Sequence, residues 1–69
     1  MICKTIDELR EEIRRKLKET DQSARALAAS SGVSSTHLNN FKLEKRSLTF
    51  ENLDRLAGVL GVKYNLKNY

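Results

Sequence analysis

The sequence predicts a single all-α domain built around four helices. Apolar residues recur at spacings of three and four in four successive segments, which is the period of a helix face packed against a core. Residues that cap helices precede these segments, and a glycine follows two of them. Proline is absent, and strand-like alternation is confined to the last residues. A chain of 69 residues is long enough for one small core.

The first helix is predicted to begin after Thr5 and to run for about four turns. Thr5 and Glu8 match the capping box, in which the threonine side chain accepts from the amide three residues on and the glutamate reaches back. Residues 1–4 are expected to be frayed. The buried stripe is formed by Ile6, Leu9, Ile13 and Leu17.

Charges on this helix are ordered by sign, with acidic residues in its first half and basic residues in its second half. This order suits the helix dipole. Ion pairs are expected between Glu11 and Arg15 and between Glu12 and Lys16, each worth about 0.2–0.5 kcal/mol. We interpret this charged face as solvated surface; a phosphate contact from its basic end is the alternative.

Two short helices joined by a tight turn are predicted in the middle of the chain. The first covers about residues 23–30, and the second is capped by Ser34 and continues to about Lys42. Gly32 is free to adopt the left-handed conformation that closes a helix, and Val33 is expected to pack between the two helices. This is a helix-turn-helix, and its polar second helix suggests a protein that reads DNA.

A fourth helix is expected to begin after Thr49 and to stop at Gly61. The short tail, residues 63–69, is ambiguous: its alternating pattern permits a short strand, while a further helical turn and a loose tail remain open. The face of the fourth helix expected to be buried comprises Phe50, Leu53, Leu56, Ala57 and Leu60.

Composition limits the class of protein. The net charge of +4 is a modest excess that permits, without requiring, binding to nucleic acid. Cys3 is the only cysteine, so no disulfide is expected, and a lone cysteine fits a reducing cytoplasm. No apolar run reaches the roughly 20 residues of a membrane span. We therefore expect a cytoplasmic protein without membrane, metal, cofactor or small-molecule partner.

The outward face of the third predicted helix is polar but carries no formal charge before Lys42. Asparagine can pair in bidentate fashion with an adenine edge, and serine or threonine can bond several bases. The alternative is an ordinary polar surface whose short side chains only cap helix ends. The candidate base-reading residues on this face are Ser35, Thr36, Asn39 and Asn40.

A basic turn follows this helix, with Lys42, Lys45 and Arg46 opposed only by Glu44. Cations beside a neutral reading face fit the division of labour in which phosphate contacts supply affinity and base contacts supply specificity. The openings of the second and fourth helices offer free amides as further phosphate sites. His37 is either a plain surface residue or a phosphate contact. It has no orienting acid, so an enzyme is not expected.

The sequence resembles the Cro/phage-repressor type of helix-turn-helix, the lambda-repressor-like domain family, over about residues 6–62. The resemblance implies a compact all-α domain of four to five helices, with the helix-turn-helix at helices 2 and 3. It also implies binding to operator DNA as a homodimer. The residues that carry it are Leu27-Ala28, Gly32-Val33-Ser34, Leu38, Phe41, Thr49, Leu53, Leu56-Ala57 and Leu60-Gly61-Val62.

The family's base-reading positions correspond to Ser35, Thr36 and Asn40, and Asn39 often adds a contact. One departure is at Ala24, where the family commonly has a glutamine that holds a phosphate and braces the first reading residue. Neighbouring polar residues are candidates to replace it at the phosphate, namely Gln22, Ser23 and Arg25.

These observations predict a sequence-specific regulator of transcription that binds double-stranded DNA, of the phage or prophage repressor type. Residues 5–62 would form the DNA-binding domain. Repressor and activator are not distinguished by the sequence. The alternative function is a protein-interaction module, such as an antitoxin or anti-repressor, that keeps the same fold.

Overall fold

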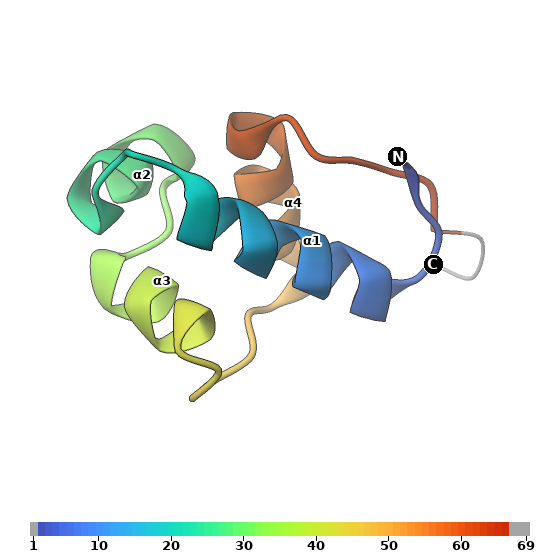
Figure 1. Ribbon diagram of the computed structural model, residues 1–69, viewed down its shortest axis with the longest axis horizontal. Helices are drawn as coiled ribbons and strands as arrows, with labels where there is room; N and C mark the ends of the chain where they lie inside the picture. Colours follow the sequence, from blue (N-terminus) through green and yellow to red (C-terminus); the bar gives the residue numbers. More distant parts are fainter. Residues whose placement is uncertain (1, 67–69) are drawn as a thin grey trace.

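Four helices form the domain, as the sequence predicts, and two very short strands join the ends of the chain (Figure 1). The structure is a computed structural model, and it describes residues 2–66. The elements in chain order are β1 (Ile2–Cys3), α1 (Ile6–Glu19), α2 (Ala24–Ser31), α3 (Ser35–Lys42), α4 (Phe50–Leu60) and β2 (Lys63–Tyr64).

Local capping explains where the helices begin and end. The predicted capping box at Thr5 is present in both halves, and the hydroxyl at the start of each later helix accepts from the amide three residues on. Gly32 and Gly61 close α2 and α4 with φ of 79° and 74°. The left-handed conformation costs glycine little because it has no Cβ. The hydroxyl caps of the later helices are Ser23, Ser34 and Thr49.

The core lies where α1 crosses α3 and α4 and where α2 packs on α3 and α4. Figure 1 shows α1 running across the middle of the molecule, with α2 and α3 gathered at one end and the strands at the other. Phe41 is fully buried at the centre, and Ile6, Phe50 and Leu60 are only partly buried at the margin. The other buried apolar side chains are Cys3, Leu9, Ile13, Leu17, Leu27, Val33, Leu38, Leu48, Leu53, Leu56, Ala57 and Val62.

The start of the chain differs from the frayed segment expected for residues 1–4. β1 pairs in parallel with β2, and the amide of Asn65 donates to the carbonyl of Cys3 at 2.8 Å. Cys3 is fully buried, and this burial raises the pKa of its thiol. The backbone is therefore held by a strand partner, and Cys3 adds to the core. Met1 lies outside the described residues.

The strand alternative for the tail is the one found, over Lys63–Tyr64, and Leu66 also packs against the core. Residues 67–69, which the expected alternation also covered, lie outside the described residues. Within residues 2–66, no helix is long and apolar enough to span a bilayer.

The ion pairs of α1 have a different spacing from the one expected. Arg14 pairs with Glu11, and Arg15 bridges Glu12 and Glu19 at 2.6 and 2.8 Å. The predicted pairs Glu11–Arg15 and Glu12–Lys16 are therefore wrong. Arg14 is drawn towards Glu11 because its other guanidinium nitrogen reaches α3, and Arg15 is long enough to span both neighbouring turns.

Tyr64 ties β2 to α4, because its hydroxyl donates to Asp54 and its ring packs edge-on against Phe50 at a centroid distance of 5.8 Å. The hydrogen bond to the Asp54 carboxylate, together with burial, raises the pKa of Tyr64 to about 12.

We expect Asp54→Ala to lower the pKa of Tyr64 towards its usual value of about 10. The measurement is an absorbance titration of the phenolate in a Tyr69→Phe background, since Tyr64 and Tyr69 are the only tyrosines. Because the folded-state pKa is raised, the stabilisation from this bond is present below about pH 10 and is lost as the pH rises towards 12. A phenol that ionises at the same pH with and without Asp54 would contradict the interaction.

Candidate nucleic-acid interface

The turn between α2 and α3 is held by the chain's own hydrogen bonds. The hydroxyl of Ser31 donates to the carbonyl of Leu27 at 2.7 Å and accepts from the amide of Val33 at 3.2 Å. Gly32 is favoured here because its φ is positive, 79°, a backbone conformation that residues with a Cβ rarely adopt. The nearest neighbour of an added Cβ would be the end of the flexible Arg55 side chain, at 2.8 Å, which can move aside. The angle between the two helices is therefore fixed by backbone geometry and by the buried Ser31, whose role was not predicted from the sequence.

The four candidate base-reading residues lie together on α3. Ser35, Thr36 and Asn39 are exposed and Asn40 is half-buried, while Leu38 on the opposite face is 2% exposed. No hydrogen bond within the described part of the chain occupies the side-chain amides of Asn39 and Asn40. Their donors and acceptors are therefore available to a ligand from solvent.

The basic turn follows α3 directly and is hydrogen-bonded to it. The amides of Lys45 and Arg46 donate to the carbonyl of Asn40 at 2.8 and 3.4 Å. The side chains of Lys42, Lys45 and Arg46 are exposed, and none of them takes part in an ion pair within residues 2–66. Three cations with no acidic partner in the described part of the chain thus lie at and beyond the carboxyl end of α3.

Glu44 closes α3 in a left-handed conformation, with φ of 62°, and its amide donates to the carbonyl of Phe41 at 3.1 Å. This is the pattern in which helices usually end on glycine. The sequence does not predict this helix end, because no glycine stands at the position. The exposure of Leu43 was not predicted either: its apolar side chain is 58% exposed beside the cations.

At the start of α2, the Ser23 hydroxyl accepts from the amide of Ala26 at 3.1 Å, so its first role is to cap the helix. Arg25 on α2 and His37 on α3 are both exposed. A hollow of about 150 Å³ lies beside Ala24. This is the position at which the lambda-repressor-like family commonly has a glutamine. Its lining residues are Leu17, Gln22, Ser23, Ala24, Leu27, Leu38, Asn39 and Lys42.

Arg14 of α1 reaches into this region from outside the helix-turn-helix. Its Nε donates to the carbonyl of Phe41 at 3.0 Å, and its guanidinium carbon lies 4.5 Å from the centroid of the Phe41 ring. Its side chain is only 12% exposed and is paired with Glu11. This side chain is engaged within the protein, unlike the exposed side chains of Lys42, Lys45 and Arg46. No local sequence signal marks the contact, because the partners are 27 residues apart.

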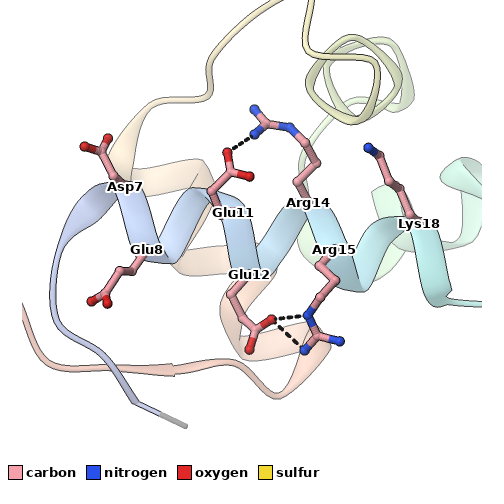
Figure 2. A pocket seen from close by; sticks show the side chains of 7 residues that line it. All are labelled: Asp7, Glu8, Glu11, Glu12, Arg14, Arg15 and Lys18. Carbon is pink, nitrogen blue, oxygen red and sulfur yellow. Dashed lines mark hydrogen bonds and ion pairs between the residues drawn. The ribbon is translucent and has the colours of Figure 1, made fainter.

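A second surface, along α1, has a different charge pattern. A hollow of about 800 Å³ lies along this helix. Figure 2 shows the side chains that line it, with Arg14 directed towards Glu11 and Arg15 towards Glu12. Both arginines are already paired with these glutamates. Acidic groups would repel a phosphate backbone, so the surface of α3 and the basic turn suits DNA better. The lining residues are Asp7, Glu8, Glu11, Glu12, Arg14, Arg15 and Lys18.

Comparison with known proteins identifies the family. No curated protein and no solved structure matches the chain. A family model described as helix-turn-helix matches residues 11–66, which is most of the chain and includes all of α2, α3 and α4. The resemblance predicted from the motifs is confirmed, and the chain belongs to the Cro/C1-type helix-turn-helix family of DNA-binding domains.

Proposed function

We propose that this protein is a sequence-specific regulator of transcription that binds double-stranded DNA and places α3 in the major groove. The observation that carries the proposal is the junction of an uncharged polar helix face with three cations at its carboxyl end that pair with no acid of residues 2–66. In DNA recognition, short amide and hydroxyl side chains read base edges and cations hold the flanking phosphates.

Each part of the surface has a distinct role in this complex. Ser35, Thr36, Asn39 and Asn40 contact base edges. Lys42, Lys45 and Arg46 hold the strand that passes the carboxyl end of α3. The strand across the groove meets the start of α2, with Ser23 and Arg25 beside its first amides. His37 is a further phosphate contact, and the exposed Leu43 offers an apolar contact to a sugar or thymine methyl.

The regulator acts as a repressor of the phage or prophage type, by occupying an operator and excluding polymerase. Two copies bind a two-fold site, because each copy presents a single reading helix and paired half-sites lie about 34–36 Å apart for dimers of this motif. α2 and α3 lie at the end of the molecule opposite the two strands, so a partner on the strand side would leave the reading face free (Figure 1).

Selection of bound sites from a pool of random duplex DNA tests the proposal. We expect an enriched sequence whose two halves are related by inversion. Loss of all enrichment at low salt, together with tight binding to another protein, would favour the alternative of an antitoxin or anti-repressor on this fold. An enriched site without internal symmetry would contradict the homodimer and leave the reading helix supported.

Replacing Lys45 or Arg46 by alanine is expected to weaken binding to all sequences by a similar factor. Each change removes one phosphate contact, so the slope of log affinity against log salt should fall by about one unit. Lys63→Ala is the matched control: it removes the same charge from an exposed residue of β2, which lies away from α2 and α3 (Figure 1). An unchanged slope in the Lys45 and Arg46 variants would remove these residues from the phosphate-binding set.

A further inference from the structure

Arg14 joins α1 to the last turn of α3 by two different contacts. Its Nε–H donates to the Phe41 carbonyl at 3.0 Å, and its guanidinium group stacks on the ring of the same residue, 4.5 Å from the centroid. Phe41 itself is fully buried. A planar guanidinium is suited to this combination, since one group supplies both a directional donor and a cationic face; a lysine ammonium supplies neither the plane nor the fixed fork.

The Phe41 carbonyl, near the end of α3, accepts two hydrogen bonds. It accepts from Arg14 and also from the amide of Glu44, which closes the helix. One residue earlier, the carbonyl of Asn40 accepts from the amides of Lys45 and Arg46. The carboxyl half of the reading face and the basic turn are therefore both attached to the helix end that Arg14 holds.

We propose that Arg14 is a positioning residue that fixes the carboxyl half of α3, and with it the base preference at the positions read by Asn39 and Asn40. This inference rests on the proposed function. Arg14 acts through Phe41 and does not touch DNA. Its charge is balanced locally by Glu11, and a second carboxylate, Glu44, lies 4.0 Å away. A guanidinium that is 12% exposed and flanked by two acids is a poor phosphate ligand.

The test is Arg14→Lys, which keeps the charge and removes the stacked plane and the directional Nε–H donor. Arg15→Lys is the matched control, because Arg15 is the next residue and its ion-pair partners among residues 2–66 are glutamates of its own helix. The measured quantity is the ratio of affinities for the selected DNA site and for sites with one base pair substituted. For base pairs contacted by Asn39 and Asn40, we expect this ratio to fall about tenfold in Arg14→Lys. For base pairs contacted by Ser35 and Thr36, the ratio should change less than twofold. Arg15→Lys should match the parent protein at every base pair.

Two outcomes would overturn the assignment. An equal loss at all base pairs would show that Arg14 supports only the general stability of the domain. Arg14→Gln tests the direct alternative, because removing a phosphate contact lowers the salt slope by about one unit, whereas removing a positioning residue leaves it unchanged. A lowered slope would therefore make Arg14 a phosphate ligand.

Amide hydrogen exchange, measured on the protein without DNA, tests the positioning role of Arg14 independently of the proposed function. In Arg14→Lys we expect faster exchange of the amides of Leu43 and Lys45, which bond to the last turn of α3, with little change at Leu27 in α2. Unchanged exchange at Leu43 and Lys45 would refute the positioning role even if DNA binding is found. Faster local exchange in a protein that selects no DNA sequence would instead support the contact and refute the proposed function.

Discussion

Leu27→Asp is expected to abolish cooperative folding. Leu27 is 2% exposed on α2, facing the core opposite α3 and α4. Removing a buried leucine costs about 2–5 kcal/mol, and the new carboxylate adds the cost of burying a charge with no partner. A domain of this size is stable by only about 3–10 kcal/mol in total. The loss is therefore comparable to or larger than the whole free energy of unfolding.

Circular dichroism during heating and urea titration measures this effect. Ala26→Asp is the matched control, because it places the same carboxylate one residue earlier, on the exposed face of the same helix. There the charge is solvated and lies near the positive end of the helix dipole, so the midpoint should change little. A normal melting curve for Leu27→Asp would mean that α2 does not pack by this face.

The parts of the fold that could be predicted from sequence are those governed by local chemistry. Thr5, Ser34 and Thr49 cap the helices that follow them, and Gly32 and Gly61 close the helices before them. In each case the side chain or the missing Cβ acts within a few residues along the chain. A short stretch of sequence therefore contains both partners of the interaction.

The features that were missed depend on residues far apart in the chain. β1 and β2 lie near opposite ends of the sequence, yet they pair. Each strand is only two residues long, which is too short for a sequence pattern to predict the pairing. Arg14 finds its partner 27 residues away at Phe41. Glu44 is a different case: its positive φ is local, but it is imposed by the closing of α3 on a residue that does not favour it.

For the candidate site, helical periodicity was enough to place Ser35, Thr36 and Asn39 on an exposed face and Leu38 and Phe41 in the core. What periodicity does not reveal is how the face is held in place. The Ser31 hydroxyl braces the turn before α3 and the Arg14 guanidinium braces the carboxyl end of α3; both bond to backbone carbonyls. Every residue has a backbone carbonyl, whatever its side chain. The sequence therefore does not predict which residue accepts such a hydrogen bond.

Asn40→Ala is expected to weaken binding to the preferred DNA site by about 1–3 kcal/mol, the range for a bidentate contact to a base edge. The side-chain amide of Asn40 has no partner among the described residues, so the change breaks no internal side-chain bond. Alanine is also the better helix former, by about half a kcal/mol. We therefore expect a protein that is at least as stable as the parent and yet binds its site less tightly.

The decisive measurement is the change in base preference rather than the loss of affinity alone. Competition between the selected site and its single-base variants should show relaxed preference at one base pair for Asn40→Ala and unchanged preference at the others. Asn65→Ala is the control, because it removes the same amide from an exposed position beyond β2. If Asn40→Ala instead weakens binding to every DNA sequence equally, the Asn40 side chain contacts the sugar-phosphate backbone of DNA. Base reading would then belong to the remaining residues of α3.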